Sequence, residues 1–261
     1  MRTIDRSEVA RDVRALGLPS DAVYLVHSSL RRVGDLENGP RTLVDGLRDA
    51  CGSRSTIVVP TFTAGNSTTT REYRRRTAGM SDRQLLAEEA KILAFHRETT
   101  PSQNVGIVAE YVRSDPASVR SNHPQTSFGA VGPYADQLVR IHDLECHLGE
   151  QSPLRRLYDV DAVVLLIGVG FEVCTCFHLA EYRLARPAPP RLYRTFVMAD
   201  GQRELREFFA PETDDRDFGR IGAEMVGESF VNVGRIRNAP VHWFRLRAGV
   251  DFAAEWMNRC R

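Results

Sequence analysis

The sequence lacks an excess of charge of either sign. Its 35 Lys and Arg residues face 34 Asp and Glu residues, which leaves a formal net charge of +1. Nothing in that balance draws the chain to nucleic acid or to an anionic membrane surface. No apolar run reaches the ~20 residues that a membrane span needs, and the charged amino-terminal segment has no apolar region typical of a secretory signal. We expect a cytoplasmic protein that binds neither nucleic acid nor membrane.

Cysteine is also scarce. The five cysteines are odd in number, and their spacing is not that of a disulfide framework. No second Cys/His pair stands at a spacing that would complete a four-ligand zinc site, and no two histidines form an H-E-x-x-H pair. We therefore expect no metal in the protein.

Apolar periodicity and turn residues predict an α/β protein. Buried strands are expected at 22–27 and 55–59, with a helix over 40–51 between them, and this order is typical of a parallel unit. Residues 161–168 form the most apolar segment and suit a central strand. We predict a single α/β domain, 1–261, with a central mixed or parallel sheet flanked by helices. Further helices are expected at 5–16, 102–113, 132–141, from about 173 to Pro187, at 219–228 and at 250–258.

Two segments have a different character. Residues 64–82 are polar and lack apolar periodicity, so they predict a long surface excursion. Residues 192–210 alternate around Asp200-Gly201, which predicts a hairpin. Within the single domain, we assign 1–190 to a coenzyme-binding and catalytic core and 191–261 to a substrate-facing lobe.

Two histidines follow predicted strands, where open α/β sheets place their ligands. His27 ends a buried strand beside Ser28 and Ser29. His178 follows the central strand by one short loop and stands three residues before Glu181, which puts the two on one face of a helix. A carboxylate there can fix the imidazole tautomer and raise its basicity. The alternative is a helical ion pair without a catalytic role.

Cys174, Cys176 and His178 alternate along the chain, which offers a second interpretation. In an extended segment the three would share a face, and one thiol could act as a nucleophile. No residue pattern identifies a base for such a thiol or a cause for a lowered thiol pKa. Buried cysteines that act as small apolar side chains are the simpler interpretation.

The charge is uneven on a local scale. Residues 71–76 carry four arginines, and residues 212–217 carry four acids. Solvated loops explain both stretches. The alternative is a binding site that uses each sign locally.

An ordered set of short blocks runs from about residue 25 to 185. No single block is specific, but their order and spacing resemble the aminoglycoside 3-N-acetyltransferase family. The blocks are His27-Ser28-Ser29-Leu30, Val58-Val59-Pro60-Thr61-Phe62-Thr63, Pro101-Ser102 with Gly106, Arg120-Ser121-Asn122-His123-Pro124, Ser127-Phe128, Gly132, Leu148-Gly149, Ser152-Pro153-Leu154, Leu165 to Gly170, Thr175, and His178-Leu179-Ala180-Glu181.

The resemblance implies a fold peculiar to this antibiotic N-acetyltransferase family and distinct from the GNAT acetyltransferases. It implies acetyl-coenzyme A, or another acyl-coenzyme A, as donor, a primary amine as acceptor, and no metal. It makes His178 the general base, with Glu181 beside it. The residues it implies for the coenzyme site are His27, Ser28, Ser29, Leu30, Arg120, Ser121, His123, Ser127 and Phe128.

We place Asp214, Asp215 and Asp217 on the substrate side, because a polycationic aminoglycoside needs carboxylates. We also expect Thr63 and Asn104 on that side. The arginines of 71–76 leave other partners open: the 3′-phosphate of the coenzyme, an anionic acceptor or an acyl carrier protein. Three alternatives therefore stand beside the aminoglycoside enzyme. They are a biosynthetic acyltransferase that uses another thioester or a carrier protein, a thiol-dependent transferase or hydrolase, and a binding protein without catalysis. A homodimer is compatible with each.

Overall fold

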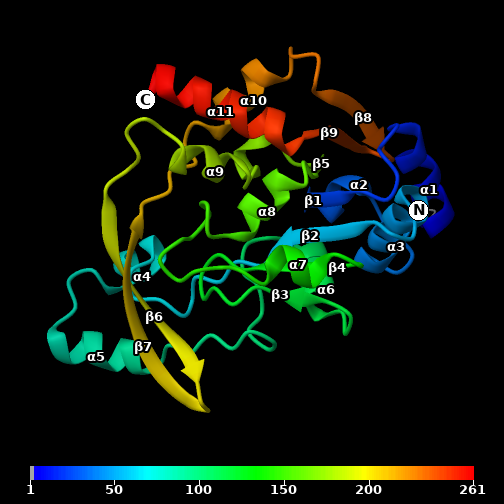
Figure 1. Cartoon of the computed structure of the whole chain (residues 1–261). Helices are drawn as coiled ribbons and strands as arrows, with labels where there is room; N and C mark the ends of the chain where they lie inside the picture. Colours follow the sequence, from blue (N-terminus) through cyan, green and yellow to red (C-terminus); the bar gives the residue numbers. More distant parts are fainter. Residues whose placement is uncertain (1–2) are drawn as a thin grey trace.

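A seven-stranded mixed sheet forms the centre of the computed structural model, which describes residues 3–261 (Figure 1). The strand order is β3-β4-β2-β1-β5-β9-β8. Strands β1, β2 and β5 run parallel to one another, and the flanking strands pair antiparallel. The strands are β1 (Val23–Ser28), β2 (Thr56–Pro60), β3 (Val119–Arg120), β4 (Phe128–Val131), β5 (Val163–Ile167), β8 (Asn232–Ile236) and β9 (Ala239–Arg245).

Both faces of the sheet are covered by helices, so the central strand is apolar throughout. All five residues of β5 are fully buried. Because side chains alternate along a strand, Val163, Leu165 and Ile167 pack on one face, while Val164 and Leu166 pack on the other. The first face is covered by α1 (Arg6–Ala15), α3 (Pro40–Cys51) and α6 (Ile107–Ser114). The second is covered by α7 (Ala135–Val139), α8 (Pro153–Asp159), α9 (Phe177–Tyr182), α10 (Phe218–Met225) and α11 (Leu246–Cys260).

Local sequence signals fix several helix starts. Asp5 caps α1 and forms a capping box with Glu8. Pro40 and Pro153 occupy the first turns of α3 and α8, where a missing N–H costs nothing. Two short helical turns, α2 (Leu30–Val33) and η1 (Phe171–Val173), follow β1 and β5.

A long hairpin lies beside the main sheet (Figure 1). It consists of β6 (Pro190–Ala199) and β7 (Gln202–Pro211). Asp200 and Gly201 form its turn with φ of 47° and 76°, the positive values that a two-residue type I′ turn requires. Helices α4 (Arg71–Thr77) and α5 (Asp82–Ala90) lie along the hairpin, and Tyr73 packs against Phe196 of β6.

The α/β fold class with a mixed sheet flanked by helices is confirmed, and the predicted parallel unit is present. The surface loop predicted at 64–82 is wrong in part: residues 66–69 are buried beside β6, and α4 begins at Arg71, with Thr70 as its N-cap. The helix expected at 102–113 begins only at Ile107, after Gly106 with a φ of 86°. The helix expected at 132–141 is shorter, because the φ of Gly132 is 131°.

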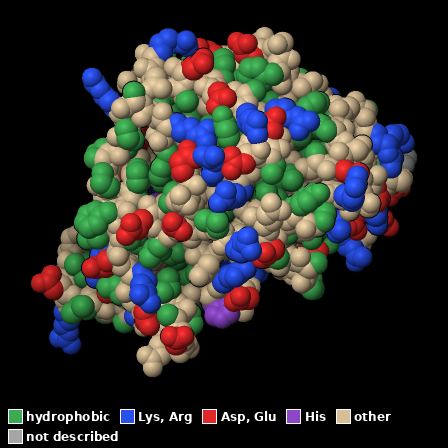
Figure 2. Space-filling model, in the orientation of Figure 1, with side chains coloured by type: hydrophobic (Ala, Val, Ile, Leu, Met, Phe, Trp, Pro, Cys, Tyr) green, Lys and Arg blue, Asp and Glu red, His purple; other side chains and the backbone are tan. Residues whose placement is uncertain are grey.

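The surface carries mixed charges. Lys and Arg side chains alternate with acids over the face drawn in Figure 2, in keeping with the net charge of +1. None of the helices in the described part of the chain combines the length and the apolar character that a bilayer span requires.

Candidate active site

A cavity of about 330 Å³ opens where the parallel strands end. β1 contributes His27 and Ser28, the segment after β2 contributes Phe62, and the segment after β5 contributes Glu172 and His178. Carboxyl ends of parallel strands meet at one sheet edge, which is the usual ligand position in open α/β folds. The other lining residues are Pro60, Asn104, Val105, Gly106, Val169, Val173, Thr175, Asp215 and Phe218.

His178 and Glu181 form a hydrogen-bonded pair on α9. Nδ1 of His178 lies 2.7 Å from Oε2 of Glu181. A carboxylate at Nδ1 holds the proton on that nitrogen, so the neutral imidazole presents its Nε2 lone pair. Within residues 3–261 no hydrogen bond engages Nε2, and the ring packs 4.7 Å from that of Phe218, centroid to centroid. This geometry leaves one ring nitrogen available to a ligand in the cavity.

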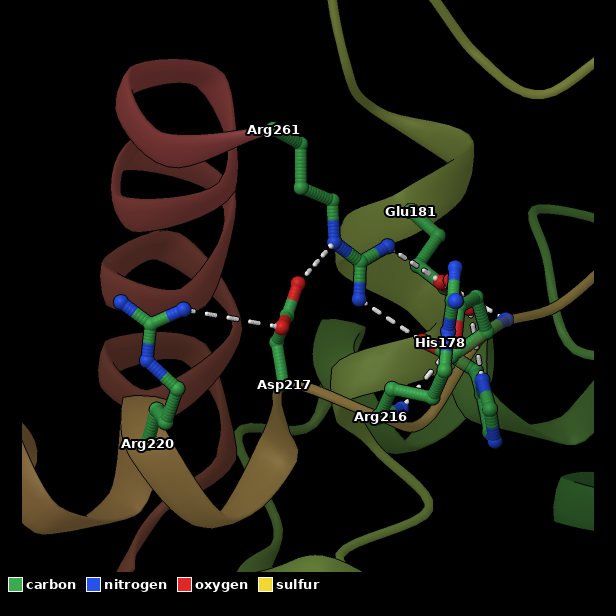
Figure 3. Close-up of polar contacts among 7 residues, drawn as sticks. His178, Glu181, Arg216, Asp217, Arg220 and Arg261 are labelled. Atoms are coloured by element: carbon green, nitrogen blue, oxygen red, sulfur yellow. Dashed lines mark hydrogen bonds and ion pairs between the residues drawn. The ribbon is translucent and has the colours of Figure 1, made fainter.

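The other oxygen of Glu181 is held from two further segments (Figure 3). Oε1 accepts hydrogen bonds from Nη1 of Arg261 at 2.6 Å and from the backbone N–H of Asp214 at 3.0 Å. Only 8% of the Glu181 side chain is exposed, so its charge needs these partners. Burial opposes the charge of Arg261, but Glu181 and then Asp217 outweigh it and raise the pKa of Arg261.

His27 differs from His178 in its surroundings. It is buried in β1, and its Nε2 has no partner within the described chain. Burial, helped by neighbouring His178, lowers the pKa of His27 to about 4. His27 therefore stays neutral at physiological pH and is a poor proton acceptor there, while His178 has a carboxylate partner. Two histidines at one cavity thus have environments suited to different roles.

The remaining members of the His27–Leu30 block lie differently. Ser28 lines the cavity with His27, whereas Ser29 and Leu30 do not. The backbone N–H of Ser29 donates to the carbonyl of Ile167 at 2.9 Å, so it is already used in the fold. Gly106 has a φ of 86°, and a Cβ there would lie 3.3 Å from the carbonyl oxygen of Ser28. Glycine thus lets the start of α6 approach β1 at the cavity.

Five residues predicted for the coenzyme site do not line this cavity: Arg120, Ser121, His123, Ser127 and Phe128. All five are buried, and the polar ones are bonded internally. The Arg120 guanidinium binds the carbonyl oxygens of Thr61 and Thr100, and burial lowers its pKa to about 10. In the structure these residues support the loops behind the cavity, and their place at a coenzyme site stays a prediction.

His123 belongs to a buried cluster with His142 and His147. The ring of His123 stacks on that of His142 at 4.5 Å and lies 4.8 Å from that of His147. His123 accepts from the backbone N–H groups of Gln125 and Thr126, and His142 bonds to the carbonyl of His147. Within residues 3–261, no group of three or more His, Cys, Asp or Glu side chains has a metal-binding arrangement.

The predicted substrate-side residues separate into two groups. Asp215 and Asn104 line the cavity. Asp214 pairs with Arg216, which lowers the pKa of Asp214 to about 2, and Asp217 pairs with Arg261. Thr63 is buried and lines a neighbouring cavity of about 510 Å³. The carboxylates of Asp214 and Asp217 are thus occupied by arginines, which the acid count alone did not indicate.

Among the arginines at 71–76, Arg76 lies beside the candidate site. Arg76 lines two neighbouring cavities, of about 510 and 320 Å³. The smaller one shares Asn104 with the cavity of His178, so the two adjoin. Arg76 lies 3.8 Å from Glu88, and about half of its side chain is exposed. A ligand longer than the first cavity can therefore extend toward this cation.

Cys174 and Cys176 do not share a face with His178. Cys176 precedes α9, Cys174 follows η1, and both are fully buried outside the cavity lining. Their sulfur atoms lie 3.4 Å apart. Burial raises the pKa of Cys174 well above its ordinary value. Neither exposure nor electrostatics favours a thiolate nucleophile here.

Three site residues were missed in the sequence: Glu172, Phe218 and Arg261. Glu172 stands five residues after the end of β5, so its position in the short segment after a buried strand was the available signal. Nothing in the spacing indicates Arg261, because it stands 80 positions from Glu181 and meets it only through packing of α11.

The chain is similar to known proteins over almost its whole length. The sequence pattern of the family described as Aminoglycoside 3-N-acetyltransferase matches residues 25–258. A relative from Bacillus subtilis, the SPbeta prophage-derived aminoglycoside N(3′)-acetyltransferase-like protein YokD, is 33% identical over 96% of this chain and 91% of its own. Its crystal structure superimposes with a TM-score of 0.91, covering 100% of this chain and 95% of that one.

Two further relatives extend the comparison. Aminoglycoside N(3)-acetyltransferase VII of Streptomyces paromomycinus is 30% identical over 97% of this chain and 91% of its own. A structure of AAC-IIIb, described as a binary complex with CoASH, shares the fold with a TM-score of 0.87 at 24% identity, covering 99% of this chain and 97% of that one. Sequence pattern and fold agree over almost the whole chain: it belongs to the aminoglycoside 3-N-acetyltransferase family, a family of acetyltransferases.

Proposed function

We propose that this protein transfers an acetyl group from acetyl-coenzyme A to a primary amine of an aminoglycoside-type acceptor, by direct attack, with His178 as general base. The observation that carries the proposal is the 2.7 Å contact between His178 Nδ1 and Glu181 at the edge of a cavity that carboxylates also line. Family membership supports the reaction class, and the geometry supports the roles.

The acceptor amine must lose a proton before it attacks. Alkyl ammonium groups have pKa values near ~10, so at neutral pH most of the acceptor is protonated. In this proposal that first proton leaves to solvent, and His178 Nε2 takes a second proton from the neutral amine as the new N–C bond forms, while Glu181 stabilises the imidazolium. His178 then gives the proton to the sulfur as the C–S bond breaks, so the products are an amide and a thiol. No acyl-enzyme is required.

Negative charge develops on the thioester oxygen during attack. The backbone N–H after Ser28 is occupied by Ile167, which leaves the start of α6 as the candidate donor. Gly106, its N-cap, lines the cavity, and no side chain caps this helix. The first N–H groups of a helix lack intrahelical partners, and its dipole favours an anion there.

The cavities are consistent with a coenzyme A thioester. A volume of about 330 Å³ is large enough for the acyl group and the end of the pantetheine arm, beside His27 and Ser28. The adjoining cavity leads toward Arg76, which we assign to a phosphate of the coenzyme. The AAC-IIIb complex with CoASH supports this donor for the fold.

The acceptor side is acidic. Asp215 and Glu172 both line the cavity, and within residues 3–261 neither carboxylate is paired with a cation. Glu172 accepts a hydrogen bond from the backbone N–H of Gly170 at 3.2 Å, which leaves its charge unbalanced. Two carboxylates without a cationic partner suit an acceptor that carries several ammonium groups, and Asn104 adds a polar side chain. We therefore propose that 191–261 works as the substrate-facing part of one domain, with Asp215, while 1–190 supplies the donor side and His178.

The test is thiol release from acetyl-coenzyme A with a panel of aminoglycosides. His178→Ala should lower kcat roughly a hundred- to ten-thousandfold, the usual contribution of general base catalysis. His96→Gln is the matched control, since the His96 side chain is 46% exposed and is absent from the cavity lining. Full turnover in His178→Ala would rule out the base assignment.

The same assay separates the donors. Longer acyl-coenzyme A esters and an acylated carrier protein are compared at equal concentration. Acetyl-coenzyme A should give the highest kcat/KM. A marked preference for the carrier protein would replace the coenzyme donor by a protein partner, and a lack of turnover with every amine would contradict the proposed function.

A further inference from the structure

One guanidinium group joins the catalytic pair to the loop that carries Asp215. Arg261 follows α11, and its side chain reaches three acceptors (Figure 3). Nη1 donates to Oε1 of Glu181 at 2.6 Å, Nη2 to the backbone carbonyl of Asp214 at 2.7 Å, and Nε to Oδ2 of Asp217 at 3.0 Å. All three nitrogens of the guanidinium group therefore donate a hydrogen bond.

The backbone of Asp214 closes this arrangement. Its N–H donates to Glu181 at 3.0 Å, while its carbonyl accepts from Arg261. Both backbone polar groups of Asp214 are thereby bound to Glu181 and Arg261. The next residue is Asp215, which lines the cavity. The position of the acceptor-side carboxylate and the orientation of the imidazole thus depend on the same guanidinium.

We propose that Arg261 is a positioning residue for acyl transfer, which holds Glu181 against His178 and fixes the 213–217 loop so that Asp215 faces the acceptor. The inference rests on the proposed function for its catalytic consequence, but not for its structural one. Arg261 is absent from the cavity lining, so it acts through other residues and does not contact the acceptor.

Charge and shape both select arginine at this position. The buried Glu181 carboxylate lies 2.6 Å from Nη1 of Arg261, so Arg261 supplies a balancing charge. A guanidinium presents several donors in a rigid plane, whereas an ammonium is a single point charge. A lysine could balance the charge, but it could not hold Glu181, Asp214 and Asp217 in one plane.

The experiment compares Arg261→Gln and Arg261→Lys with Arg259→Gln. Arg259 is the matched control, because it lies on α11 with 66% of its side chain exposed and, within residues 3–261, pairs only with Glu224. Circular dichroism and thermal unfolding first establish that each variant is folded. The measurements are kcat, the KM of each substrate, amide hydrogen exchange over 212–217, and the Nδ1–H proton resonance of His178.

Arg261→Gln should lower kcat roughly ten- to a hundredfold, since small misplacement of catalytic groups costs up to that much. The acceptor KM should rise, while the acetyl-coenzyme A KM should stay within about twofold, because the guanidinium contacts Glu181, Asp214 and Asp217 and none of the residues assigned to the coenzyme. The kcat of Arg261→Lys should lie between that of Arg261→Gln and that of the unsubstituted chain. The kcat of Arg259→Gln should equal that of the unsubstituted chain.

Two readouts do not depend on turnover. Exchange of the Asp214 amide should accelerate roughly ten- to a hundredfold in Arg261→Gln, the scale of a lost hydrogen bond to a charged group. The downfield resonance of the His178 Nδ1 proton, assigned with His178→Gln, should broaden or disappear. If no amine is acetylated by the unsubstituted protein, the proposed function fails while these two measurements still test the positioning role.

The opposite results would overturn the inference. A folded Arg261→Gln variant with unchanged exchange at 212–217 and an unchanged His178 resonance would show that neither group depends on Arg261. A loss of thermal stability with unchanged kcat and both KM values would show a merely structural role.

Discussion

Glu181 accepts a hydrogen bond from Nδ1 of His178 at 2.7 Å, and its second oxygen is held by an arginine and a backbone N–H from other parts of the chain. Both oxygens of the Glu181 carboxylate are therefore held by hydrogen bonds. Such a carboxylate cannot turn away from the imidazole, so the tautomer of His178 is fixed before any substrate binds. This relationship gives the first prediction.

Glu181→Gln should lower kcat by roughly a hundredfold or more, because an amide can orient the imidazole but cannot stabilise its protonated form. The KM values should change less. Steady-state kinetics with acetyl-coenzyme A and the best amine measure both quantities. Glu224→Gln serves as control, because Glu224 is exposed and forms a surface ion pair with Arg259. A kcat within threefold of the unsubstituted value would remove Glu181 from the mechanism.

Asp215→Asn should raise the acceptor KM by roughly tenfold, the effect of one charge-assisted hydrogen bond, with a smaller change in kcat. The carboxylate lines the cavity and has no cationic partner within residues 3–261. Glu212→Gln is the control, because Glu212 lies in the same loop, pairs with Arg191 and is absent from the lining. Equal acceptor KM values for the two variants would show that Asp215 does not bind the amine.

Cys174→Ala and Cys176→Ala should each keep kcat within about threefold, since neither thiol meets the conditions for a nucleophile. Mass spectrometry after incubation with acetyl-coenzyme A should show no acyl adduct on either cysteine. A trapped adduct that disappears in one of the variants would restore the thiol-dependent alternative. Thermal unfolding of both variants separates loss of packing from loss of chemistry.

The buried histidines should make stability fall in acid. Burial lowers the pKa of His27 and of His142 to about 4 and that of His147 to about 3, against 6.5 for an ordinary histidine. The unfolded chain therefore binds more protons between those values, so stability is complete above roughly pH 6.5 and is lost as pH falls toward the folded pKa values.

Each buried histidine should contribute a slope of up to about 1.4 kcal/mol per pH unit in that window. Urea unfolding at several pH values between 4.5 and 7.5 measures the total. His142→Asn should flatten the slope, whereas His96→Gln should not, because His96 is 46% exposed. A free energy of unfolding that does not change from pH 7 to pH 5 would contradict the assignment.

Local sequence signals were sufficient for much of the fold. The helix at Pro40–Cys51 and the strands at Val23–Ser28 and Val163–Ile167 stand close to their predicted bounds. Each has a strong apolar pattern or a clear boundary residue. The surface-loop prediction for 64–82 was wrong for residues 66–69, because these polar residues are buried beside β6, more than 100 positions away. Propensity does not report such a partner.

The site shows the same division. His27, His178 and Glu181 were identified from strand ends and helical spacing, and the structure brings all three near one cavity, two of them in its lining. Arg120 and His123 belong to recognisable blocks, yet their polar atoms form hydrogen bonds with other groups of the protein. A motif shows which residues recur, but it does not show whether they face a ligand or a neighbouring loop.

The sequence by itself determined the α/β class, the apolar central strand and the pairing of His178 with Glu181, because these depend on contacts between residues that are near in the chain. Only the tertiary structure decided which acids are free for an acceptor and which are paired. Asp214 and Asp217 are neutralised by arginines, one local and one at position 261, while Asp215 lines the cavity. The contact between Arg261 and Glu181 joins residues 80 positions apart, and such contacts follow from the packing of whole elements.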